Sequence, residues 1–96
     1  MKSIFSVEYS IFCELLRDLR LQKGLTQMQL STALGMAQSF VSKYEMGERR
    51  LDFVEVSRIC DELGIGIEAF ARTYVKALVK AGARTSIKRK KGSRGE

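Results

Sequence analysis

The sequence predicts an all-α fold, a compact bundle of about five short helices in one domain. Three observations lead to this prediction. Apolar residues recur at helical spacing, and no convincing stretch alternates with a period of two. Glycines follow the apolar-periodic segments, where helices commonly end. The chain has 96 residues, of which 45% are hydrophobic, so it can bury one small core.

The first two helices are bounded by recognisable caps. The first is expected over about residues 7–23, with Gly24 as its left-handed carboxyl cap. The second begins after Thr26, which forms a capping box with Gln29, and it ends at Gly35. The expected inward residues of these two helices are Phe12, Leu15, Leu16, Leu19, Leu30 and Leu34.

The third helix is expected over residues 38–45 and is followed by Gly47. The fourth begins at Asp52, which offers an acceptor at the cap and has Glu55 three residues later, and it ends at Gly64. The expected inward residues of the fourth helix are Val54, Ile59, Cys60 and Leu63.

A fifth helix over about residues 67–81 completes a domain of residues 7–81. Its apolar stripe consists of Ile67, Phe70, Ala71, Tyr74 and Leu78. Residues 82–96 have too few apolar side chains to fold and are expected to form a basic, disordered tail. Residues 1–75 carry nine basic and ten acidic side chains, whereas residues 76–96 carry eight basic and one acidic. The basic end either favours a polyanion such as nucleic acid or only keeps the chain in solution.

The composition argues against several classes of function. The chain has no histidine, which excludes most zinc sites and most imidazole-based catalysis. Cys13 and Cys60 are expected to be buried thiols in a reducing cytoplasm. No run of about 18 apolar residues exists, so no membrane association is expected. No nucleophile or acid pair converges, so we expect no enzyme, no metal, no cofactor and no small-molecule ligand.

The second and third helices are joined by a very short link, residues 34–37. This is the length of the tight turn in a helix-turn-helix, and Gly35 stands where that turn needs a positive φ. Ser31 is small enough to let the two helices approach each other. On the third helix, Val41 and Tyr44 are expected to face the core, with Phe40 at the margin.

The opposite face of the third helix is polar and carries no acid. It consists of Gln38, Ser39, Ser42 and Lys43. Gln and Lys side chains can hydrogen-bond the edges of DNA bases, and Ser can bond several bases. Periodicity alone leaves two interpretations open, because such a face either reads DNA or simply meets water.

The stretch "LRDLRLQKGLTQMQLSTALGMAQSFVSKYEMGERRLDFVEVSRICDELGI" resembles the Cro/lambda-repressor (Xre) family of helix-turn-helix transcriptional regulators. The resemblance rests on Leu16 and Arg20, then on "GLTQ", "LG", "SFVSKYE" and "GERR" in one ordered series. It covers about residues 15–70. It implies a lambda-repressor-like DNA-binding domain that places the helix over 38–45 in the major groove of an operator, most often as a repressor.

The resemblance also implies roles for individual residues. The base-contacting positions correspond to Gln38, Ser39, Ser42 and Lys43. The DNA-backbone positions correspond to Thr26, Gln27, Phe40, Arg49 and Arg50. Gln27 would also support Gln38. Arg20 and Glu45 would form a structural ion pair between the first and third helices.

Two positions depart from the family pattern. Ala37 stands where a Ser or Thr cap is usual, and Ser31 stands where Ala is commoner. The implied partner is double-stranded DNA, bound by a homodimer. The fifth helix extends its apolar stripe to Leu78 and Val79, which fits either a dimer seam or extra packing on the first helix. The alternative function is a protein-interaction module that binds a partner through this helix.

Overall fold

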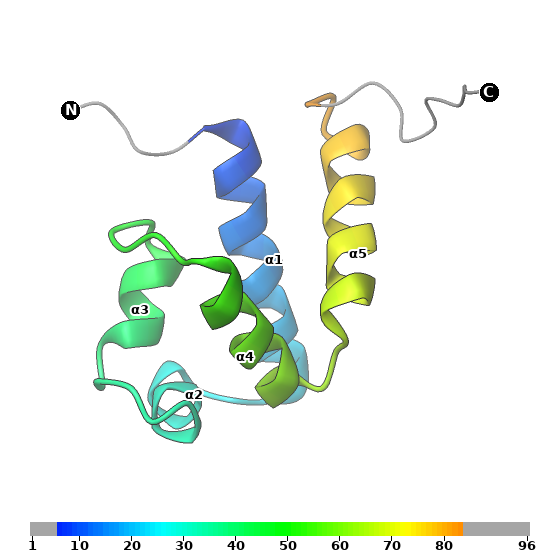
Figure 1. Ribbon diagram of the computed structural model, residues 1–96. Coiled ribbons are helices and arrows are strands. Elements are labelled where there is room, and N and C mark those ends of the chain that lie inside the picture. Colours follow the sequence, from blue (N-terminus) through cyan, green and yellow to red (C-terminus); the bar gives the residue numbers. More distant parts are fainter. Residues whose placement is uncertain (1–5, 84–96) are drawn as a thin grey trace.

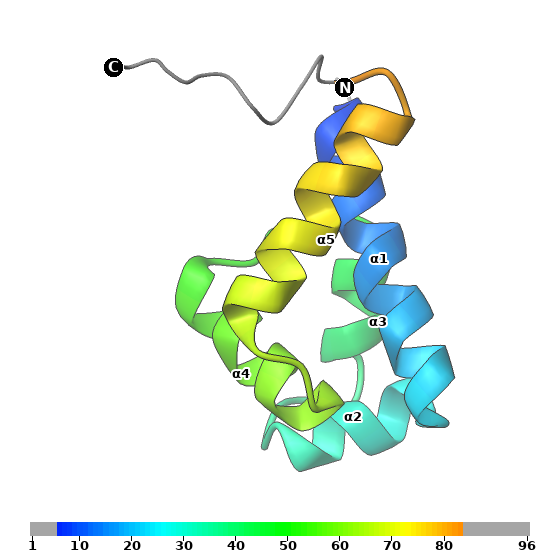
Figure 2. The same ribbon diagram turned by 90° about the vertical axis from the view of Figure 1, so that its right-hand side faces the viewer.

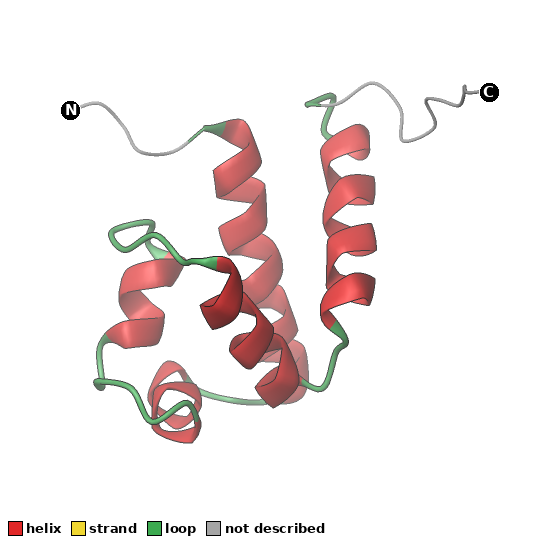
Figure 3. Cartoon of the chain, viewed as in Figure 1, coloured by secondary structure: helices red, strands yellow, loops and turns green. Residues whose placement is uncertain are grey.

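The computed structural model describes residues 6–83 and confirms the all-α prediction. The helices are α1 (Val7–Lys23), α2 (Gln27–Ala33), α3 (Phe40–Glu45), α4 (Phe53–Leu63) and α5 (Ile67–Lys80). Figure 3 shows them joined by short loops, with no strand in the part of the chain that the structure describes. The predicted basic tail lies outside the described residues, apart from Gly82 and Ala83.

The two longest helices, α1 and α5, pack against each other, and Figures 1 and 2 show them side by side. α4 packs against both of them, while α3 packs against α1 and α2. The short α2 and α3 lie at one end of the bundle, next to each other (Figure 1). A helix of six or seven residues is unstable alone, so these two depend on the scaffold made by α1, α4 and α5.

Local capping sets most helix ends where the sequence predicts them. The Thr26 hydroxyl accepts the N–H of Gln29 at 3.0 Å, and the Gln29 side chain accepts the N–H of Thr26 at 2.8 Å. Asp52 and Glu55 form the equivalent capping box at the start of α4. Gly24 ends α1 with a φ of 81°, a left-handed conformation that favours glycine.

A single hydrophobic core fills the space between the helices. Its fully enclosed members include Leu16 of α1, Leu30 of α2 and Ile59 of α4. The whole buried cluster consists of Leu16, Leu30, Leu34, Phe40, Val41, Tyr44, Val56, Ile59, Cys60, Leu63 and Phe70. Every helix therefore contributes to one core, which fixes the position of α3 relative to the others.

Two expectations about inward faces are wrong, those for Val54 and Ala71. Val54 is 66% exposed and Val56 is buried instead, because the buried face of α4 follows the spacing 56, 59, 60 and 63. Ala71 on α5 is also exposed. Leu78 is completely buried in a single chain, where α5 packs along α1. The extra apolar turn of α5 therefore supports α1, and Leu78 is not available for a dimer seam.

Candidate nucleic-acid interface

The turn between α2 and α3 is fastened to the rest of the bundle. Gly35 has a φ of 69°, which the tight turn requires and which only glycine adopts readily. Leu34 is buried, and its carbonyl oxygen accepts a 2.7 Å hydrogen bond from Nη2 of Arg58 on α4. The sequence does not predict this role of Arg58, because its partner is a backbone carbonyl 24 residues away.

The third helix begins two residues later than predicted. Its regular part starts at Phe40, while Gln38 and Ser39 form a turn before it. The N–H of Phe40 donates to the Ala37 carbonyl at 2.9 Å, and Ser39 makes no side-chain cap. Gln38 and Ser39 thus precede α3 in the chain, so their side chains project from a turn at its amino end.

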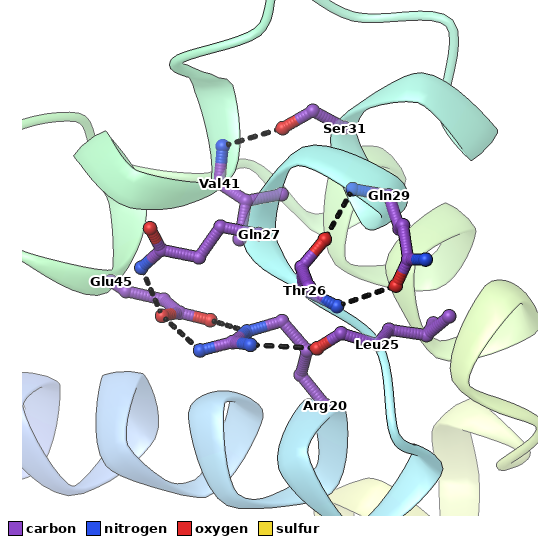
Figure 4. A network of polar contacts seen from close by, with 8 residues as sticks. All are labelled: Arg20, Leu25, Thr26, Gln27, Gln29, Ser31, Val41 and Glu45. Atoms are coloured by element: carbon purple, nitrogen blue, oxygen red, sulfur yellow. Dashed lines mark hydrogen bonds and ion pairs between the residues drawn. The ribbon is translucent and has the colours of Figure 1, made fainter.

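Ser31 supplies a hydrogen bond that the start of α3 would otherwise lack. Its hydroxyl oxygen accepts the backbone N–H of Val41 at 3.2 Å, and both side chains are fully buried. Figure 4 shows this bond bridging α2 and α3. Ser31, one of the two departures from the family pattern, therefore provides an acceptor on α2 for a backbone N–H in the first turn of α3.

A buried ion pair joins α1 to the end of α3. Nε of Arg20 lies 2.7 Å from Oε2 of Glu45, and the two side chains are only 7% and 3% exposed. Nη2 of Arg20 donates to Oε1 of Glu45 at 3.1 Å, and Nη1 donates to the Leu25 carbonyl at 2.7 Å. This geometry places Arg20 and Glu45 in the structural role that the resemblance implies, with both ions well hydrogen-bonded.

Gln27 is tied into the same network. Its Nε2 donates to Oε1 of Glu45 at 2.9 Å, as Figure 4 shows. The side chain at the start of α2 is therefore oriented by the buried ion pair, and through it by Arg20 on α1. Thr26, the residue before it, uses its hydroxyl to cap α2.

Three of the four residues predicted to contact bases lie together at the surface, and Lys43 lies outside their groove. Gln38, Ser39 and Lys43 are exposed, and Ser42 is partly buried with its hydroxyl donating to the Ser39 carbonyl at 3.0 Å. Gln38, Ser39 and Ser42 line one open groove together with Gln27, Met28 and Ala37. No acidic side chain lines this groove, so its surface is compatible with a nearby phosphate backbone.

Met28 belongs to this groove although the sequence analysis did not single it out. Its side chain is exposed at the start of α2, between Gln27 and the residues that precede α3. Helical periodicity offers the hint, because Met28 falls off the stripe that Leu30 and Leu34 bury. An exposed apolar side chain here can contact sugars or thymine methyl groups.

The placement of Phe40 at the helix margin, and with it its role as a DNA-backbone contact, is wrong. Its side chain is 5% exposed, belongs to the core and packs edge-to-face on Tyr44 with ring centroids 5.4 Å apart. The guanidinium of Arg49 lies 5.0 Å from the centre of the Phe40 ring. The ring is enclosed because Phe40 and Tyr44, four residues apart, lie on the same buried face of α3.

The two arginines after α3 already have partners within the chain. Arg49 makes a two-pronged contact with Glu55, at 3.1 Å and 2.8 Å, and donates to the Arg50 carbonyl at 2.9 Å. These hydrogen bonds lower the pKa of Glu55 and raise that of Arg49. The Arg50 guanidinium stacks on the Tyr9 ring at 4.2 Å. Both therefore help to hold the loop that leads from α3 to α4.

The described residues contain neither a cluster of three potential metal ligands nor a helix long and apolar enough to cross a bilayer. Burial raises the pKa of both cysteine thiols, and that of Cys60 reaches about 11. Neither thiol has the depressed pKa of a reactive cysteine. The polar groove beside α3 is thus the main candidate for a binding surface.

The part of the chain that forms this surface is similar to known proteins. A helix-turn-helix family model matches residues 16–70, more than half of the chain. The restriction-modification controller protein C.Esp1396I superimposes with a TM-score of 0.72 at 23% identity, covering 78% of this chain and 99% of its own. The clp gene regulator ClgR from Corynebacterium glutamicum gives a TM-score of 0.69 at 20% identity, covering 79% and 81%. No curated protein matches the sequence. The structural similarity shows a common fold, and the family match spans both helices of the groove.

Proposed function

The chain belongs to the Cro/C1-type helix-turn-helix family of DNA-binding transcription regulators, and we propose that it represses transcription by inserting the amino end of α3 into the major groove of an operator. The observation that carries this proposal is the acid-free polar groove around Gln38, Ser39 and Ser42. An ordinary water-exposed helix face usually carries both acidic and basic side chains. The groove around Gln38 instead offers uncharged hydrogen-bonding side chains on a turn that the bundle holds in place.

In this proposal the side chains of α3 and of the turn before it read bases. Gln38 suits adenine, whose N6 and N7 pair with a side-chain amide, and Lys43 suits guanine O6 and N7 or a phosphate. Ser39 and Ser42 provide short donors and acceptors beside them. Sequence preference is then concentrated in a few base pairs, and Gln38 contributes most because it is exposed and aligned with the groove.

Contacts to the DNA backbone come mainly from the start of α2. Gln27 is partly exposed and held by Glu45, so its position is fixed before DNA arrives. Thr26 lies next to it. Arg49 and Arg50 contribute less than the resemblance alone implies, because Glu55 and the Tyr9 ring already engage them. The basic residues of 82–96 add affinity for any DNA sequence.

The operator is expected to be an inverted repeat bound by a homodimer, with half-sites about one helical turn apart. C.Esp1396I, which shares the fold, has been described as a tetramer on a 35 base-pair operator. The alternative, a protein-interaction module that binds through α5, has less support because the stripe of α5 ends in the buried Leu78. We place the regulator in the cytoplasm, where its free thiols stay reduced.

Selection of bound sites from random double-stranded DNA tests the proposal. The wild-type protein should enrich an inverted repeat, and its affinity should fall log-linearly with salt at about 0.9 per phosphate neutralised. Gln38→Ala should cost about 1–3 kcal/mol at one base pair and relax the preference there. Gln22→Ala, on the exposed surface of α1, is the matched control. If Gln38→Ala and Lys43→Ala select the same sites as the wild type at the same affinity, the assigned reading surface is wrong.

A further inference from the structure

Met28 lies in the first turn of α2, between two glutamines that the bundle already engages. Gln27 donates to Glu45 at 2.9 Å (Figure 4). The Gln29 side chain accepts the N–H of Thr26 at 2.8 Å. Met28 itself is 53% exposed and lies outside the hydrophobic core. Packing within the chain therefore does not account for an apolar side chain at this position.

Met28 lines the polar groove beside α3 together with Ala37 and Gln38. The groove has a volume of about 590 Å³ and extends from the start of α2 to the turn before α3. Ala37 is exposed and contributes only a methyl group. The other residues that line the groove are polar and uncharged. Met28 and Ala37 are thus apolar side chains within a hydrogen-bonding surface, in the same groove as the glutamine that the proposed function assigns to a base.

DNA offers one apolar group to such a surface. The base edges in the major groove carry hydrogen-bond donors and acceptors, and the exception is the C5-methyl group of thymine. A side-chain amide pairs with adenine, and the adenine of a duplex faces a thymine that carries this methyl group. An amide reader such as Gln38 therefore has a C5-methyl group close by, in the base pair that it reads.

We infer that Met28 and Ala37 form an apolar subsite for the C5-methyl group of a pyrimidine, in or beside the base pair that Gln38 reads. This inference rests on the proposed function and adds a second determinant of sequence preference to it. Thymine supplies the methyl group in unmodified DNA, and 5-methylcytosine supplies the same group in methylated DNA. A flexible, polarizable thioether adapts its shape to such a small apolar group. A phosphate is the poorer occupant, since an apolar side chain offers its oxygens no donor.

Fluorescence anisotropy of the full-length protein tests the inference on the operator that site selection yields. Single thymines are replaced by deoxyuridine, which lacks only the methyl group, at matching positions of the two half-sites. At one such position the wild type should lose about fourfold in affinity per half-site, because burial of one methyl group contributes about 0.8 kcal/mol. Met28→Ala should bind the thymine and uracil operators equally.

Leu21→Ala is the matched control, since Leu21 is 51% exposed near the end of α1 and lies outside the groove. It should keep the preference of the wild type for thymine over uracil. Met28→Ala should keep a urea midpoint close to that of the wild type, because the lost side chain is exposed and alanine favours a helix. A changed preference in this variant then reports on DNA contact and not on unfolding.

Cytosine methylation separates the methyl group from the rest of thymine. At the position where uracil weakens binding, the base pair is changed to cytosine–guanine, with and without the C5-methyl group. The wild type should bind 5-methylcytosine about fourfold more tightly than cytosine per half-site, and Met28→Ala should not distinguish them. A wild type that prefers thymine over uracil but binds both forms of cytosine equally would contradict a methyl subsite.

Two further results would overturn the inference: a wild type that tolerates uracil at every position, or a uracil penalty that persists undiminished in Met28→Ala. The second result would assign the penalty to the DNA itself or to another side chain. Failure of the proposed function is recognised separately. A protein that selects no operator refutes that function and the subsite with it, whereas a protein that binds its operator regardless of the methyl group refutes the subsite alone.

Discussion

The hydroxyl of Ser31 is expected to stabilise the start of α3, and Ser31→Ala tests this directly. The Val41 N–H that it accepts lies fully inside the protein, and no other acceptor among the described residues bonds that N–H. Removing the hydroxyl leaves a buried donor unsatisfied, which costs about 1–3 kcal/mol. In a domain of this size that corresponds to a fall in melting temperature of roughly 4–24 °C.

Urea unfolding followed by circular dichroism measures this loss as a lower midpoint at an unchanged slope. Thr32→Ala is the matched control, because Thr32 is the next residue on α2 and is exposed. The control should stay within about 0.5 kcal/mol of the wild type. A loss for Ser31→Ala as small as that of the control would refute the reasoning. It would mean that the Val41 N–H readily finds another acceptor, such as the Ala37 carbonyl one turn earlier.

Three further predictions concern buried or paired polar groups. Glu45→Met should destabilise the fold by about 3–5 kcal/mol because it leaves the Arg20 guanidinium buried without a counter-charge. In urea unfolding, the double replacement of Arg20 and Glu45 by methionine should cost less than the sum of the single ones. Tyr44→Phe should leave thermal stability unchanged or raise it, since the buried Tyr44 hydroxyl has no hydrogen-bond partner among the described residues. Arg49 lowers the pKa of Glu55 from its ordinary 4.5, so this contribution to stability is lost as pH falls through the lowered pKa. Glu55→Gln should remove that part of the acid-side slope in urea unfolding below about pH 5.

Much of the fold could be predicted because its determinants are local. The capping box of Thr26 and Gln29 and the left-handed Gly24 act within one helical turn, so the sequence places those helix ends correctly. Leu30 and Leu34 fall inward for the same reason, since the helical repeat alone puts them on one stripe. The sequence also shows directly that the polar face of Gln38, Ser39, Ser42 and Lys43 contains no acidic residue.

The start of α3 could not be predicted, because its hydrogen bonds come from elsewhere. Periodicity extends the helix back to Gln38, whereas the structure begins it at Phe40 and supplies the Val41 N–H with an acceptor on α2. Propensity carries no information about an acceptor ten residues away, and packing decides such a pairing.

The sequence by itself determined the helix content, the helix-turn-helix and the polar face, since caps, periodicity and the absence of acids are properties of neighbouring residues. Only the tertiary structure decided which charged groups are already engaged. Arg49 meets Glu55 and Arg50 meets Tyr9 because α1 and α4 pack beside the loop after α3. The packing of the helices also buries Leu78 and leaves Phe53 exposed beside a groove. Partners such as Arg50 and Tyr9 lie far apart in the chain, and only the packed helices bring them within reach of one another.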